Sequence, residues 1–269
     1  MRAHSAVLCL LLAALPCSLA PAQAVSLPMQ APKYLDYSKE LDSPSTLVVV
    51  GRLGKWKEGK RERLADGQLG GGNAVASVSG TQFFKAPVST TLQPRATLHG
   101  KADKPTLQFD AQIARLPDGK EQRQLRNGGT PLGEDTLALF VLTQRPKQKG
   151  LDVVGVLPFD KDQYKGSDPE AAFLDAMRDV HTINQRVREL EQALAAVDGA
   201  RDADAKKTAL QALQAVVDKK PDLKVPANDS LLSQHVGPFE VRAQKRLADH
   251  KAADAAKAGE VPPAGGSGK

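Results

Sequence analysis

The chain has 269 residues, with 37 Lys and Arg against 31 Asp and Glu, and only 4% of its side chains are aromatic. The resulting net charge of +6 is small and is spread along the chain, so it does not indicate a nucleic-acid-binding protein. We therefore expect no nucleic-acid partner, and a fold that depends on a modest aliphatic core.

The first 24 residues have the pattern of a secretory signal peptide. A short positive region around Arg2 is followed by an apolar stretch at residues 6–15, and residues 22–24 (Ala-Gln-Ala) have the small-x-small pattern of a cleavage site. We predict cleavage between Ala24 and Val25 and export to the periplasm or the medium. The alternative is an uncleaved membrane anchor, which the apolar stretch is too short to favour, because a span needs about 20 residues.

Both cysteines, Cys9 and Cys17, lie in this segment. The mature chain would contain no cysteine, which excludes a disulfide framework, a thiolate zinc site and a cysteine nucleophile. No later apolar run approaches the length of a membrane span, so we expect none after cleavage.

Residues 46–160 carry the pattern of a small β domain. An extended lead-in segment (residues 25–45) precedes it, and we expect Tyr34, Leu35 and Tyr37 to pack this segment in place. Short apolar runs are separated by glycine and proline turn signals, which favours an antiparallel barrel or sandwich over an α/β sheet. The expected strands are residues 46–53, 73–85, 88–99, 105–116, 135–144 and 151–159, of which 73–85 and 88–99 are interrupted by Gly80 and Pro94 as bulged or edge strands would be.

The most continuous apolar run outside the signal segment is residues 137–142. Both of its alternating sets are apolar, so a strand here would need cover on both faces. We predict that it is the central strand of the β domain and that it pairs with residues 151–159. The two sets are Leu137, Leu139 and Val141 on one face, and Ala138, Phe140 and Leu142 on the other.

Residues 167–250 are predicted to be helical. Ser167, Asp168 and Pro169 form a helix start with a capping residue and an early proline. A long helix ends near Gly199, a second covers residues 203–218 as the other half of a hairpin, and a last helix is interrupted at residues 237–238. The tail, residues 251–269, is rich in Ala, Gly, Pro and Lys and is expected to be disordered.

The first helix carries an apolar seam with the spacing of a coiled coil. Two alternatives follow from this seam: it captures a protein partner or a second copy of the chain, or it packs the helical hairpin within one chain. The seam consists of Val180, Ile183, Val187, Leu190, Leu194 and Val197.

No catalytic constellation is recognisable. The mature chain contains no Gly-x-Ser-x-Gly elbow and no Ser-x-x-Lys motif, and its histidines are scattered along the chain. We predict no catalytic residue, no metal and no cofactor. The histidines are His99, His181, His235 and His250, and we expect His181 on a helix surface.

A basic loop around the single tryptophan is the best binding candidate. Residues 55–63 are expected to form a hairpin with Gly59 at its tip, and a tryptophan among cations can stack on a sugar while the cations hold an anion. The alternative is that the lysines guard a sheet edge and the tryptophan closes the barrel end. The candidate binding residues are Trp56, Lys57, Lys60, Arg61 and, at a strand end, His99.

One resemblance rests on three stretches: residues 45–52 (Ser-Thr-Leu-Val-Val-Val-Gly-Arg), residues 98–101 (Leu-His-Gly-Lys) and residues 133–142. Over residues 45–160 the chain resembles exported bacterial proteins with barrels similar to OB-fold or netrin-like domains. The resemblance implies a five-stranded Greek-key barrel and no particular activity. The chain departs from it by a long insertion between residues 54 and 88 and by the absence of cysteine.

We therefore expect an α+β protein: a small antiparallel, OB-like β-barrel, then a helical hairpin, then a disordered tail. The expected function is that of an exported non-catalytic binding or interaction module. The alternative is a binder of anionic envelope polysaccharide through the Trp56 loop, and an enzyme of an unfamiliar type stays open.

Overall fold

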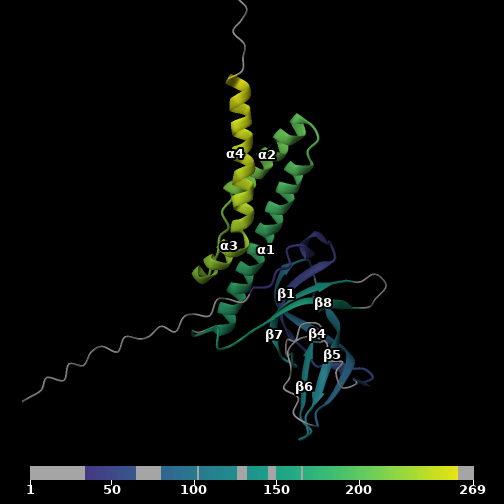
Figure 1. Cartoon of the computed structure of the whole chain (residues 1–269). Coiled ribbons are helices and arrows are strands. Elements are labelled where there is room, and N and C mark those ends of the chain that lie inside the picture. Colours follow the sequence, from purple (N-terminus) through teal and green to yellow (C-terminus); the bar gives the residue numbers. More distant parts are fainter. Residues whose placement is uncertain are drawn as a thin grey trace, which may run out of the picture. The chain divides into compact units, whose positions relative to one another are not determined.

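The computed structural model describes residues 34–64, 80–101, 103–125, 132–144, 150–164 and 166–259. Within these ranges the chain is a mixed α+β protein with one eight-stranded sheet and four α-helices (Figure 1). The signal segment with its cleavage site, the glycines at 70–72 and the last ten residues lie outside the described residues.

Outside residues 55–63, where two short strands replace the predicted hairpin, the observed strands follow the predicted ones with two exceptions. The two strands expected between residues 73 and 99 are, in the described part, one strand of 18 residues, and a short strand after the turn at residues 116–120 was not predicted. Its residues are mostly polar, so no apolar alternation marks it. The strands are β1 (Thr46–Leu53), β2 (Lys57–Glu58), β3 (Glu62–Arg63), β4 (Gln82–His99), β5 (Thr106–Arg115), β6 (Glu121–Leu125), β7 (Leu137–Thr143) and β8 (Leu151–Pro158).

The strands pair in the order β2-β4-β1-β7-β8-β5-β6, with β3 on β4 and a further pairing between β4 and β5. The contact of β5 with β8 is parallel and short, and the other pairings are antiparallel. Strand β4 is long enough to pair with β5 along its first half and with β1 along its second. Its register against β1 shifts between Val50 and Gly51, opposite Pro94, because proline has no N–H to offer the ladder. The bulge predicted from Pro94 is therefore confirmed.

Strand β7 pairs with β8, as predicted, and its other neighbour is β1; every residue from Leu137 to Leu142 is buried. Its two alternating sets of side chains enter two different hydrophobic clusters. Ala138, Phe140 and Leu142 belong to an inner cluster that also contains Leu53 and Leu92. Leu137, Leu139 and Val141 belong to an outer cluster that contains residues of the helices. The double burial predicted for this strand is confirmed.

The helices begin and end close to the predicted positions. Asp168 caps the first one by accepting a hydrogen bond from the Ala171 N–H, and Pro169 is its first residue. The last helix reaches Gly259, so the boundary predicted at residue 250 is wrong by about two and a half turns. The side chains of residues 251–256 are exposed, so this part of the helix forms without burying a face. The helices are α1 (Pro169–Gly199), α2 (Ala203–Asp218), α3 (Asp229–His235) and α4 (Gly237–Gly259).

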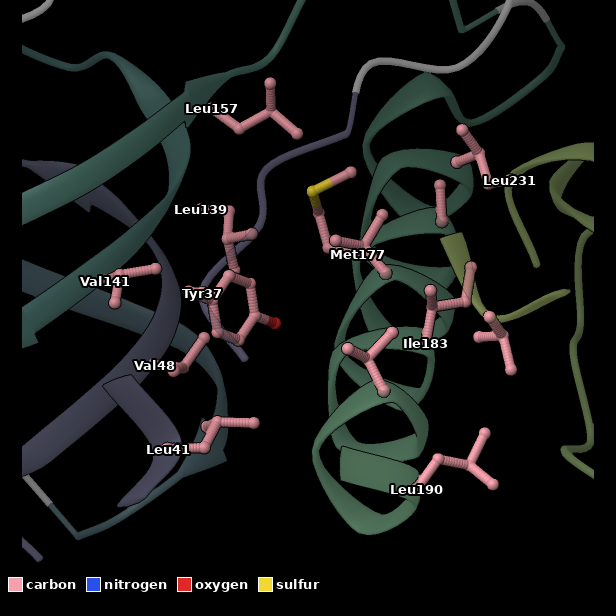
Figure 2. Packing of buried hydrophobic residues seen from close by; sticks show 14 of the residues in the cluster. Tyr37, Leu41, Val48, Leu139, Val141, Leu157, Met177, Ile183, Leu190 and Leu231 are labelled. Carbon is pink, nitrogen blue, oxygen red and sulfur yellow. The ribbon is translucent and has the colours of Figure 1, made fainter. Parts of the chain in front are cut away.

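Helix α1 packs on the outer side of β1 and β7. Met177 and Ile183 share a cluster with Leu139 on the sheet and with Tyr37 and Leu41 of the lead-in segment, and Figure 2 shows Tyr37 beside Leu139, facing α1. The packing expected for Tyr37 is thereby confirmed. None of the helices in the described ranges has both the length and the apolar composition that crossing a membrane requires.

All six seam residues on α1 are buried within this chain. They share the outer cluster with Leu210 and Leu213 of α2 and with Ala243 and Leu247 of α4. The structure therefore favours the second alternative for the seam, packing inside one chain.

Truncating Phe140 tests the inner cluster. Phe140→Ala should lower the free energy of unfolding by about 3–5 kcal/mol, because the side chain is fully buried and would leave a cavity. Val154→Ala is the matched control on neighbouring β8: its side chain is 50% exposed, so the change should be within about 0.5 kcal/mol. Urea titration measures both, and a loss below about 1 kcal/mol for Phe140→Ala would contradict the packing described.

Candidate functional site

The residues around Trp56 do not form the predicted hairpin. Strands β2 and β3 both pair with β4 and together act as one interrupted edge strand. The interruption falls opposite Pro87, which has no N–H to donate; its carbonyl instead accepts a hydrogen bond of 2.8 Å from the N–H of Gly59. Gly59 is needed there, because a Cβ atom would lie 2.8 Å from Cγ of Pro87.

The Trp56 ring is occupied by contacts inside the chain. Phe109 meets it edge to face, with ring centroids 5.4 Å apart, and the Arg123 guanidinium lies 5.7 Å from its centroid. The Trp56 side chain packs against the inner hydrophobic cluster, and its main-chain N–H donates to Glu134. Trp56 therefore closes the end of the inner cluster, which is the structural alternative considered from the sequence.

Strand alternation also separates the predicted binding residues. Lys57 stands opposite Ser89 and Glu58 opposite the buried Val88, so the side chains of Lys57 and Glu58 emerge on opposite faces of the sheet. Lys57 lies on the solvent face and is exposed, whereas Trp56 contacts the inner one. These two residues cannot contact one ligand from the same face.

Arg61 is engaged in a charged quartet with Glu58, Glu121 and Arg123. Its guanidinium donates to Glu121 at 2.6 and 3.1 Å and to both oxygens of Glu58. Arg123 lies within 3.7 Å of both carboxylates. Because β2 and β6 lie on opposite edges of the β4–β5 pair, this quartet draws the two edges together over the apolar face of Ala86 and Ala111.

The quartet should make stability sensitive to acid. The hydrogen bond from Arg61 is the main cause that lowers the pKa of Glu121 below its usual 4.5. A carboxyl whose pKa is depressed on folding contributes stability that is present above about pH 4.5 and is lost as the pH falls through the folded-state value. Glu121→Gln should cost about 1–2 kcal/mol at pH 7 and remove part of the loss seen between pH 4.5 and pH 3.

Urea titrations at pH 7, 4.5 and 3 measure this effect. Asp118→Asn is the control, because Asp118 pairs with an exposed lysine at a turn. Equal acid sensitivity of Glu121→Gln and the unmodified protein would show that the quartet does not contribute.

His99 lies far from the Trp56 loop, next to α1. His99 is the last residue of β4, and Lys57 pairs with Ser89, ten residues earlier in the same strand. At about 3.3 Å per residue the two places are up to about 30 Å apart along the strand. The predicted binding residues therefore form no single site: Trp56 and Arg61 are joined through Arg123, and Lys57 and His99 stand apart.

His181 is buried, so its expected position on a helix surface is wrong. Its side chain is 7% exposed, its Nδ1 lies 3.1 Å from the hydroxyl of Tyr37, and its ring centroid is 6.1 Å from that of His99. Its pKa is lowered from 6.5 to about 4, mainly by burial and also by the neighbouring His99. His181 follows the seam residue Val180 directly, and its burial depends on the lead-in segment covering that side of α1.

Two other charged residues of α1 are buried and were not singled out from the sequence. The Asp179 carboxylate accepts hydrogen bonds from the main-chain N–H groups of Lys224 and Val225 and from the Asn228 side chain. Arg186 donates to the last carbonyls of α2 and to Glu240 of α4. These residues fasten the segments that follow α1, and their partners are too distant in sequence for a local pattern to reveal them.

The exposed face of the β4–β5 pair carries a row of polar side chains. Its residues alternate with the buried Val88, Thr90 and Leu107, so they point away from the inner cluster. Their groups are hydroxyls, one amide, one carboxylate and one ammonium, which suit hydrogen bonding to a polar ligand. The row consists of Lys57, Ser89, Thr91, Thr106, Gln108 and Asp110.

In the part of the chain that the structure describes, no three His, Cys, Asp or Glu side chains gather in a way that could hold a metal ion. Comparisons of the chain with protein-family models, curated proteins and solved structures found no match. The polar row on β4 and β5 is therefore identified as a candidate site from its geometry alone.

Proposed function

We propose that this protein is an exported, non-catalytic binding module: an OB-like barrel that carries its own helices on one side and binds an extended polar polymer, such as a polysaccharide chain, on the other. The observation that carries the proposal is the exposed polar row on β4 and β5. The helices stabilise the proposed barrel by packing on the outer side of β1 and β7.

Closure of a barrel is supported by the strand pairings. Strand β1 pairs with β4, β4 with β5, β5 with β8, β8 with β7, and β7 with β1 again. A circuit of five strands with one parallel contact is the expected arrangement of a small Greek-key barrel of the OB type. Strands β2, β3 and β6 extend the β4–β5 pair beyond this circuit.

The position of the polar row supports a ligand along β4 and β5. OB-type barrels bind oligosaccharides and oligonucleotides on the outer face of their second and third strands. In the proposed barrel these places are taken by β4 and β5. An extended chain lying along this pair could contact the hydroxyl groups of Ser89, Thr91 and Thr106 and the amide of Gln108.

The charges favour a neutral polymer over a polyanion. Arg61 and Arg123 are neutralised by Glu58 and Glu121, and the polar row carries one ammonium group, that of Lys57, and one carboxylate, that of Asp110. The anionic polysaccharide of the alternative would have to bind through Lys55, Lys57 and Lys60, which are exposed. Ionic strength separates the two, because binding through exposed cations weakens with salt.

Affinity electrophoresis through gels containing a neutral glucan, a chitin-type glycan or dextran sulfate tests the ligand class. We expect retardation by a neutral glycan that persists at high salt. Thr91→Ala combined with Gln108→Ala should weaken binding about tenfold, since each lost hydrogen bond contributes about 0.5–1.5 kcal/mol.

Lys60→Ala is the matched control, because Lys60 is exposed but lies outside the row. Retardation only by dextran sulfate, lost in salt and in the Lys60→Ala variant, would favour the anionic alternative. Absence of retardation by every glycan would overturn the polysaccharide proposal.

Export is tested by expressing the full chain in a bacterial host. The extracytoplasmic fraction should contain a chain that begins at Val25, because residues 22–24 form the cleavage pattern. Amino-terminal sequencing identifies the cut, and Ala24→Arg should abolish it. A full-length chain that stays in the cytoplasm would contradict this part of the proposal.

A further inference from the structure

His181 and Asn184 hold the described part of the lead-in segment, residues 34–45, on α1. They lie three positions apart on the helix, so they share one face. The Asn184 side chain accepts from the Tyr37 N–H at 2.7 Å and donates to the Leu35 carbonyl at 3.1 Å. His181 adds the contact with the Tyr37 hydroxyl.

Tyr37 in turn is wedged between α1 and the sheet. Its side chain is 2% exposed and lies in the outer cluster with Val48 and Val141 (Figure 2). The polar contacts of His181 and Asn184 therefore hold a residue on which the helix–sheet packing depends. Loss of the lead-in segment would uncover the part of the outer side of β1 and β7 that Tyr37 and Leu41 cover.

A protonated His181 has no suitable place in this contact. An imidazolium donates through both ring nitrogens, and the Tyr37 oxygen could accept only from Nδ1, since Nε2 is buried without a partner. A buried cation without a partner is unstable, and His99 on β4 would add a like charge.

The charged groups around this contact are engaged elsewhere. On the lead-in segment, Asp36 accepts from Ser38, and Asp42 accepts from Arg188 and Gln192 of α1. Arg178, one turn before His181, pairs with Asp175. On α3, His235 stacks on Tyr34 with ring centroids 3.7 Å apart. Among the described residues, no carboxylate forms an ion pair with His181.

We propose that His181 makes the attachment of the lead-in segment to α1 and the sheet acid-labile: below neutral pH its imidazole takes up a proton by leaving the contact, the lead-in segment detaches, and the outer apolar face of β1 and β7 becomes accessible. The device is local, because the inner cluster lies on the opposite face of β1 and β7 and the polar row lies on β4 and β5.

The size of the response follows from proton linkage. In the closed contact the pKa of His181 is about 4, and in the open state it returns to about 6.5. As the pH falls, His181 is therefore protonated at a higher pH in the open state than in the closed one. The equilibrium constant for opening rises by up to a factor of ten for each pH unit below 6.5. Between pH 7.5 and pH 5 the expected rise is about thirtyfold.

Hydrogen exchange of the Tyr37 amide in the full chain measures this opening. After correction for the intrinsic rate, the opening constant should rise about thirtyfold from pH 7.5 to pH 5, while amides of β5 keep their protection. His181→Gln retains a hydrogen-bonding group for Tyr37 but cannot titrate, so the rise should disappear. His99→Gln should reduce the rise, because the His99 ring contributes to the lowering of the His181 pKa.

Two controls separate His181 from the other histidines. His250→Gln, at an exposed ion pair with Asp254, should leave the pH response unchanged. His235 stacks on Tyr34 of the lead-in segment and burial lowers its pKa, so His235→Gln should remove only a smaller part of the response than His181→Gln does. An unchanged rise in both His181→Gln and His99→Gln would overturn the proposal. So would a response that disappears in His235→Gln, or a loss of protection that is equal at Tyr37 and throughout β5.

Discussion

The rest of the structure depends on the burial of β7 on both faces. A strand whose two sides are both apolar is stable only when each side is covered, and no single cluster can cover both. The inner side is covered by residues of the sheet itself, including Leu53 and Leu92. The outer side is covered by α1 and by Tyr37 of the lead-in segment. The helices are thus part of the core of the β domain.

This division also decides which surfaces are available for binding. The outer side of β1 and β7 is occupied by α1, and the inner side is closed at one end by Trp56. The solvent face of β4 and β5 keeps its polar side chains exposed along a long strand. A binding site on that face would not disturb either hydrophobic cluster, so ligand binding and the stability of the core would depend on different side chains.

Several charged residues that look like surface groups in the sequence have structural partners. Arg61 joins two sheet edges through Glu58 and Glu121, and Asp179 and Arg186 satisfy main-chain groups at the ends of segments. Such groups are costly to bury alone, and each one therefore ties its partners into position. The same principle applies to His181. Its Nε2 is buried without a hydrogen-bond partner, so burial favours the neutral imidazole over the charged form.

The amino-acid sequence by itself determined the elements whose signals are local. The alternation at residues 137–142, the cap at Asp168 and the break at Gly237 each depend on neighbouring residues, and each appears where it was expected. Only the tertiary structure decided the surroundings of Trp56, Arg61 and His181. Phe109, Glu121 and Tyr37 approach them from distant parts of the chain, and a residue's exposure and charge state depend on such neighbours rather than on its own sequence position.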